Sequence, residues 1–94
     1  MLFRSCLVEH DGILWRLGGY DGSQIVKTTY KLSQGAWIRG PDLKEPRGGL
    51  ACGVFYDPLA NQKVLVVAGG HNSHCLSSTE LLRSGSNQFE QGEP

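Results

Sequence analysis

The chain has 94 residues, of which 39% are hydrophobic and 19% are charged, a composition typical of a globular domain and not of a disordered one. Nine basic and nine acidic residues give a formal net charge of zero and no basic stripe, so nucleic acid is not an expected partner. The longest apolar run, residues 64–68, is too short to cross a membrane, and residues 1–8 do not resemble a secretory signal.

The first half of the chain predicts four strands joined by short turns. Asp11 and Gly12 separate two apolar runs, which is a strong hairpin signal because both central residues of a type I′ turn need a positive φ. Gly18 and Gly19 end the second run, and residues 33–35 form a further turn. The expected strands are residues 4–9, 13–17, 26–32 and 36–39.

The second half of the chain repeats this organisation. A second glycine pair, Gly69 and Gly70, follows the first by 51 residues and again closes an apolar run. A period of about 50 residues is typical of repeat architectures. No stretch keeps a helical apolar spacing, and 13 Gly and 4 Pro interrupt the chain, so an all-β fold of two four-stranded antiparallel sheets is predicted. The expected strands of the second copy are residues 50–56, 64–68, 79–83 and 88–90.

Aromatic and cysteine positions extend the match between the two copies. Two positions that follow the glycine pair in the first copy match two positions 52 residues later. Because the glycine pairs themselves are 51 residues apart, this match implies one extra residue in the loop that follows Gly70. An offset of 46 aligns two cysteines, which implies that a longer turn, residues 57–63, replaces the first hairpin turn. The matched pairs are Tyr30 with Leu82, Trp37 with Phe89, and Cys6 with Cys52.

These motifs together resemble kelch repeats, the units of a β-propeller. The resemblance covers residues 4–90, although the second copy has Leu82 in place of the family's Tyr and Phe89 in place of its Trp. The residues that carry it are 14–22, Tyr30, Trp37, 41–43, 46–49 and 64–70.

The resemblance implies two four-stranded antiparallel blades of a kelch-type β-propeller. Because propellers usually have about four to eight blades, two blades would form an incomplete propeller whose uncovered apolar faces favour self-association of the isolated chain. Trp37 and Phe89 are expected to fill space between adjacent blades. The implied organisation is blade 1 at residues 4–40, an inter-blade link at 41–49, blade 2 at 50–90 and a tail at 91–94.

The three cysteines indicate the redox state and the compartment. An odd number argues against a disulfide framework, and free cysteine behaves as a small buried hydrophobe. We therefore expect Cys6 and Cys52 to be reduced packing residues, with a bridge between them as the alternative. Reduced cysteines favour a cytoplasmic location.

The resemblance places partner-binding loops after each glycine pair and in the link, at residues 20–24, 71–77 and 44–48. Tyr and Arg are enriched in binding hot spots. Each candidate also has a structural interpretation: Tyr20 can pack on a neighbouring residue, Arg47 can bond carbonyls between blades, and Asn72 can be an ordinary turn residue. The candidate partner-binding residues are Tyr20, Asp21, Arg47, His71, Asn72 and His74.

Catalytic and metal chemistry have little support. His71, His74 and Cys75 form the only metal-like cluster, but no further ligands have matching spacing, so a solvated polar loop is the preferred interpretation. No nucleophile motif or phosphate loop is present, and we expect no catalytic residue, no metal and no cofactor.

The expected function is therefore protein–protein interaction. The resemblance implies a substrate-recognition subunit of a cullin-based ubiquitin ligase. The alternatives are an actin-associated kelch scaffold or, in a different class, a fragment of a propeller-type copper oxidase.

Overall fold

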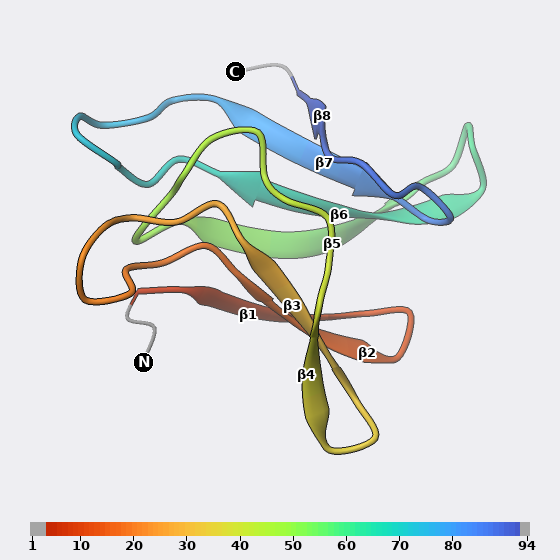
Figure 1. Cartoon of the computed structure of the whole chain (residues 1–94). Coiled ribbons are helices and arrows are strands. Elements are labelled where there is room, and N and C mark those ends of the chain that lie inside the picture. Colours follow the sequence, from red (N-terminus) through yellow and green to blue (C-terminus); the bar gives the residue numbers. More distant parts are fainter. Residues whose placement is uncertain (1–3, 93–94) are drawn as a thin grey trace.

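The chain forms two four-stranded antiparallel sheets, described for residues 4–92 by a computed structural model (Figure 1). In each sheet, strands adjacent in the sequence are adjacent in space, and neither sheet closes on itself. Sheet 1 contains β1 (Cys6–His10), β2 (Ile13–Leu17), β3 (Thr29–Ser33) and β4 (Ala36–Arg39). Sheet 2 contains β5 (Ala51–Asp57), β6 (Gln62–Ala68), β7 (Thr79–Arg83) and β8 (Glu90–Gln91).

This architecture confirms the predicted all-β class and the two four-stranded sheets. Within residues 4–92 there is no helix, and so none that could span a membrane. The start of the segment 1–8 and the end of the expected tail 91–94 lie outside the described residues, and Gln91 belongs to β8.

Local turn chemistry explains the hairpins. Asp11 and Gly12 both have positive φ, at 55° and 79°, which confirms the hairpin predicted from this dipeptide. The third strand begins at Thr29 and not at residue 26. The segment before it pairs with the link instead, because the carbonyls of Val26 and Lys27 accept hydrogen bonds from backbone N–H groups of residues 47 and 43 at 3.2 and 2.8 Å.

The registers of the two sheets correct the predicted alignment of the copies. The N–H of Gly40 donates to the carbonyl of Thr29, and the N–H of Gly92 donates to that of Thr79, both at 2.9 Å. Thr29 therefore corresponds to Thr79, and Tyr30 corresponds to Glu80. The alignment of Tyr30 with Leu82 was wrong. The loop after the second glycine pair is one residue shorter than its counterpart, and the turn before β8 is longer.

The match of Trp37 with Phe89 agrees with the register, since Ile38 pairs with Lys31 as Glu90 pairs with Leu81. The match of the cysteines does not. Cys6 pairs with Leu17 and Ala51 pairs with Ala68, each directly before a glycine pair. Cys6 therefore corresponds to Ala51 and not to Cys52.

This one-residue difference sets how the sheets stack. Because side chains alternate between the faces of a strand, Cys6 and Cys52 lie on opposite faces of corresponding strands. Both nevertheless pack against the core between the sheets. The sheets therefore stack head to tail, and each presents a different face to the other. The inner face of sheet 1 contains Cys6, Val8, Trp15 and Leu17, and the inner face of sheet 2 contains Cys52, Val54, Leu65, Val67, Leu82 and Phe89.

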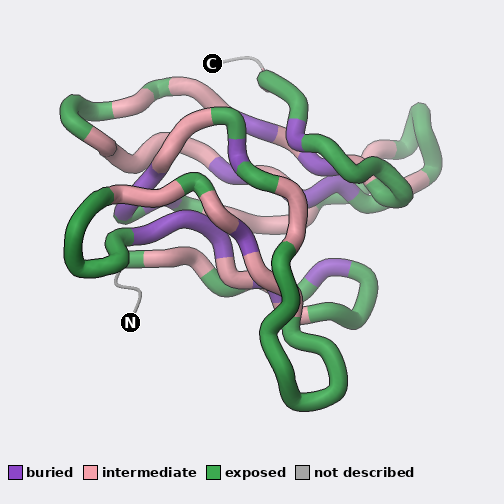
Figure 2. The backbone as a smooth tube through the Cα atoms, viewed as in Figure 1, coloured by how far each residue is buried: buried purple, intermediate pink, exposed green. Residues whose placement is uncertain are grey.

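The stacked sheets form a wedge. Among the described strands, the backbone of β1 lies close to those of β5 and β6, whereas the backbones of β2, β3 and β4 do not approach sheet 2. Figure 1 shows β4 and β8 far apart, with the link running between the sheets. The link, which in the structure comprises residues 40–50 between β4 and β5, contributes Leu43 and Leu50, which are 2% and 8% exposed, to the core. Buried residues therefore gather between the sheets and along the link, while every residue of β4 is exposed (Figure 2).

A disulfide joins the two sheets at the narrow side of the wedge. Cys6 and Cys52 are bonded, with their Cα atoms 6.2 Å apart, so the prediction of reduced cysteines was wrong. The head-to-tail stacking brings β1 and β5 together and points both side chains into the same core. Cys75 is free and exposed.

We expect Cys52→Ser to lower the free energy of unfolding by about 2–4 kcal/mol, because the bridge closes a loop across 46 positions and restricts the unfolded chain. Urea unfolding measures the loss. Cys75→Ser is the matched control and should not change the midpoint. If dithiothreitol leaves the wild-type midpoint where it was, the thiols are reduced as the sequence indicated.

Candidate partner-binding surface

The glycine pairs place two loops at the same end of the sheets. Gly69 and Gly70 have φ of 67° and 88°, which favours glycine. A Cβ at Gly70 would lie 2.8 Å from the carbonyl oxygen of Gly48 in the link, and a Cβ at Gly18 would overlap the carbonyl of Arg47. The glycines therefore let the end of each apolar strand approach the link, and a loop follows at each point.

The first loop, residues 20–24, is organised by Asp21. Its carboxylate accepts hydrogen bonds from the backbone N–H groups of Ser23 and Gln24, both at 2.9 Å. These two bonds lower the pKa of Asp21 below its ordinary value of 3.8, and the bond from Gln24 has the largest effect. The hydroxyl of Tyr20 donates to the carbonyl of Gly22 at 3.1 Å, and the Tyr20 side chain is 36% exposed.

The second loop, residues 71–77, is anchored on the link. The backbone N–H of His71 donates to the carbonyl of Gly48, and the N–H of Gly48 donates to that of His71, both at 2.9 Å. The amide Nδ2 of Asn72 donates to the carbonyl of Pro46 at 3.0 Å. His74 is exposed, and its Nδ1 lies 3.1 Å from the hydroxyl of Ser73. The base of this loop is therefore fixed by the link, while its tip faces solvent.

A surface cavity of about 370 Å³ lies between the two loops, lined by Arg4, Tyr20, Ile25, His71 and Asn72. It brings together three of the six residues singled out from the sequence. Of the others, Asp21 shapes the first loop, His74 lies at the tip of the second, and Arg47 is internal. Arg4 and Ile25 were missed, because nothing in their local sequence marks them as neighbours of the second loop.

Arg47 forms a buried network with sheet 2. Arg47 and Glu80 are both fully buried, and the Nε of Arg47 lies 3.0 Å from Oε2 of Glu80. The guanidinium also donates to the carbonyls of Gly69 and Ser78, both at 2.9 Å, and to the Ser78 hydroxyl at 2.8 Å. In this structure Arg47 is thus enclosed by its own chain, as the structural interpretation of this residue describes.

Glu80 completes the network from the other side. Its two carboxylate oxygens accept hydrogen bonds from the backbone N–H groups of Lys44 and Glu45, at 2.5 and 3.2 Å. Sequence reasoning gave Glu80 no structural role. The available signal was an acidic residue directly before two apolar residues of a strand, Leu81 and Leu82, where burial without a partner is costly.

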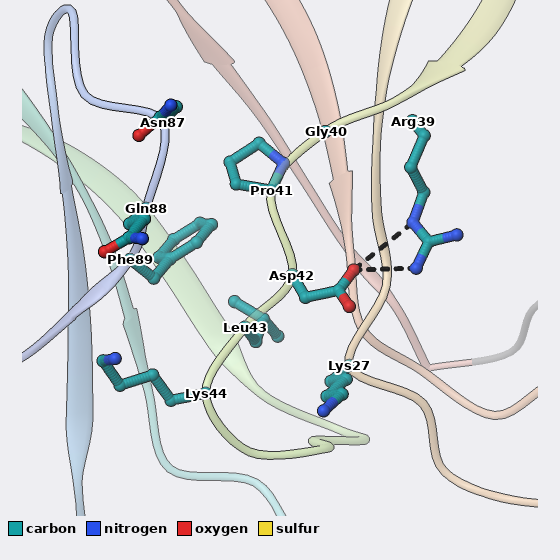
Figure 3. A pocket seen from close by; sticks show the side chains of 10 residues that line it. All are labelled: Lys27, Arg39, Gly40, Pro41, Asp42, Leu43, Lys44, Asn87, Gln88 and Phe89. Carbon is teal, nitrogen blue, oxygen red and sulfur yellow. Dashed lines mark hydrogen bonds and ion pairs between the residues drawn. The ribbon is translucent and has the colours of Figure 1, made fainter.

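A larger cavity of about 710 Å³ lies at the wide side of the wedge (Figure 3). Arg39 and Asp42 form an ion pair there at 2.9 Å, and the side chains of Lys27 and Lys44 lie along the same cavity. None of the six sequence candidates lines it. It is a polar surface hollow beside the exposed strand β4.

Residues 4–92 hold no group of three or more His, Cys, Asp or Glu side chains placed to bind a metal ion. His71 and Cys75 are joined by an isolated backbone bridge, but their side chains do not form such a group with His74.

Comparison with the models of known protein families gives no match to the chain, and comparison with curated proteins gives none either.

Arg47→Ala should lower the free energy of unfolding by about 3–5 kcal/mol, because it leaves the buried carboxylate of Glu80 without a counter-charge. Arg39→Ala, which breaks an exposed ion pair, should lower the free energy of unfolding far less, because water screens an exposed pair. Urea unfolding of the two variants gives the comparison. Equal costs would contradict the burial of the Arg47 network.

The carboxyl group of Asp21 should titrate below pH 3.8, since its hydrogen bonds favour the ionised form. Because folding lowers this pKa, ionised Asp21 contributes to the free energy of unfolding. That contribution is fully present above the pKa of the unfolded chain and is lost as the pH falls through the pKa of the folded chain. Carbon-13 NMR of the carboxyl group measures this directly, with the amide shifts of Ser23 and Gln24 as reporters. In Asp21→Asn those amide shifts should lose this pH dependence, and a wild-type pKa at or above 3.8 would contradict the prediction.

Proposed function

We propose that the chain is a non-catalytic protein-interaction module whose two sheets are blades of a kelch-type β-propeller. The proposal draws on the kelch-like motifs of the sequence and on the head-to-tail stacking, which is the arrangement that successive blades require. The observation that carries the binding role is the cavity that Tyr20 shares with His71 and Asn72.

This cavity has properties suited to recognition. Its volume of about 370 Å³ falls within the range of small binding pockets, and it combines one aromatic ring with imidazole and amide groups. The bonds of Gly48 to His71 and of Pro46 to Asn72 hold one wall in place before a partner arrives. Such preorganisation lowers the entropic cost of binding. A short peptide that inserts a side chain against Tyr20 is the occupant these features suit.

For the partner we propose the substrate of a cullin-based ubiquitin ligase, as the kelch resemblance implies. A cytoplasmic location belongs to this proposal and requires that the chain also folds with Cys6 and Cys52 reduced, since disulfides are rare in the cytosol. No observation in the described residues favours the actin-scaffold or copper-oxidase alternatives over this one.

A random peptide library displayed on phage and selected against the wild-type protein provides a probe. A selected peptide should bind Tyr20→Ala at least about 30-fold more weakly than wild type, the effect of losing a hot-spot aromatic residue. Calorimetry with the synthetic peptide measures the affinity.

Tyr56→Ala is the matched control, because Tyr56 is 54% exposed but lies in the β5–β6 hairpin at the opposite end of sheet 2. The affinity of Tyr56→Ala for the selected peptide should stay within about twofold of the wild-type affinity, as expected for a residue outside the interface. Selected peptides that bind both variants equally well would place the binding surface elsewhere.

A further inference from the structure

Within residues 4–92, each sheet has one face that does not pack against the other sheet, and on sheet 1 this outer face carries large exposed apolar side chains. Alternation along the strands places Leu7, Leu32 and Trp37 on the face opposite the core, where they are 59%, 38% and 37% exposed. Arg16 lies on the same face, with its guanidinium 5.3 Å from the ring centroid of Tyr30 and 4.7 Å from that of Trp37. The outer face of sheet 1 is defined by Leu7, Glu9, Leu14, Arg16, Tyr30, Leu32, Trp37 and Arg39.

The corresponding positions of sheet 2 are buried against sheet 1. By register, Trp37 corresponds to Phe89 and Leu32 corresponds to Leu82, and these counterparts are only 2% and 3% exposed. Leu14 corresponds to Leu65, which is fully buried. The outer face of sheet 1 thus repeats much of a surface that, in sheet 2, packs on another sheet.

Sheet 2 has the reciprocal uncovered face. Phe55 is 45% exposed there, Val66 and Leu81 are half-buried, and Val64 is fully buried. Val66 corresponds to Trp15, and Ala51 corresponds to Cys6, which both belong to the inner face of sheet 1. The outer face of sheet 2 is defined by Ala51, Gly53, Phe55, Asp57, Gln62, Val64, Val66, Ala68, Thr79, Leu81, Arg83 and Glu90.

Charge also distinguishes the two outer faces. On sheet 1, Arg39 forms an ion pair with Asp42 of the link at 2.9 Å and Arg16 is matched by Glu9, so this face carries no net charge. On sheet 2, Asp57 and Glu90 both pair with Arg83, at 3.2 and 3.1 Å, which leaves one net negative charge. Two copies of the sheet 2 face would therefore meet with like charge, whereas a sheet 1 face against a sheet 2 face avoids that repulsion.

We infer that two copies of this chain associate by packing the outer face of sheet 1 in one copy against the outer face of sheet 2 in the other. The contact continues the stacking already present within the chain, with the same order of faces. Because the two surfaces differ, the interface is heterologous, and each copy retains one face for a further copy. The inference depends on the sheet registers and not on the loop cavity, so it stands or falls separately from the proposed binding function.

The test uses two charge substitutions, Trp37→Glu on the outer face of sheet 1 and Phe55→Glu on that of sheet 2. Sedimentation velocity should show the wild type associating as its concentration rises, and each variant alone sedimenting as a single chain. An equimolar mixture of the two variants should form a dimer and nothing larger, since Trp37→Glu keeps an intact sheet 2 face and Phe55→Glu keeps an intact sheet 1 face.

Leu59→Glu is the control, because Leu59 is 98% exposed and lies in the β5–β6 turn, outside both faces. It should associate like the wild type. Urea midpoints verify that the variants fold, and Leu7→Glu replaces Trp37→Glu if the latter does not. A wild type that stays monomeric overturns the inference. So does a Phe55→Glu variant that still self-associates, or a mixture that stays monomeric.

Discussion

The link between the sheets, residues 40–50, is the element on which the rest of the structure depends. Toward sheet 1, its backbone bonds Lys27 and Gly19, at 2.8 and 2.7 Å. Toward sheet 2, the fully buried guanidinium of Arg47 pairs with the carboxylate of Glu80. It also donates hydrogen bonds to the carbonyls of Gly69 and Ser78. The Cys6–Cys52 bridge and the shared core also join the sheets, and the link adds hydrogen bonds to both. Leu43 fills the space between the two sheets, and the hydrogen bonds of the link hold the angle between them.

The candidate binding surface is a consequence of this arrangement. The glycine pairs have no Cβ, so the strand ends can reach the link, and the loops that follow emerge at the same end of both sheets. Gly48 then pairs with His71 and Pro46 with Asn72, so the link forms the floor under the second loop. A change that displaced Arg47 would therefore disturb the cavity without touching any residue that lines it.

Features fixed by neighbouring residues were predictable from the sequence, and features fixed by distant residues were not. The Asp11–Gly12 hairpin and the glycine-terminated strands follow from local backbone preferences. The partner of Glu80 lies 33 positions away, so nothing local indicates that this carboxylate is buried. The odd cysteine count argued against a bridge, but whether Cys6 and Cys52 bond depends on how β1 and β5 face each other across the core.

The register error has a similar cause. The offset that matches Trp37 with Phe89 also aligned Tyr30 with Leu82. A pair of hydroxyl residues in each copy, Thr28 and Thr29 against Ser78 and Thr79, carried the correct offset. Of the site, Tyr20, His71 and Asn72 were found because loops after glycine pairs are recognisable. Their convergence on one cavity was not, since it requires the relative placement of the two sheets.

We expect the link to join the two sheets into one cooperative unit. Native-state hydrogen exchange tests this most directly, by comparing the amides of the β2–β3 ladder in sheet 1 with those of the β6–β7 ladder in sheet 2. If the sheets unfold as one unit, the slowest amides of both ladders should open with the same free energy, equal to that of global unfolding. Opening of sheet 1 at a markedly lower free energy, with sheet 2 still protected, would contradict it.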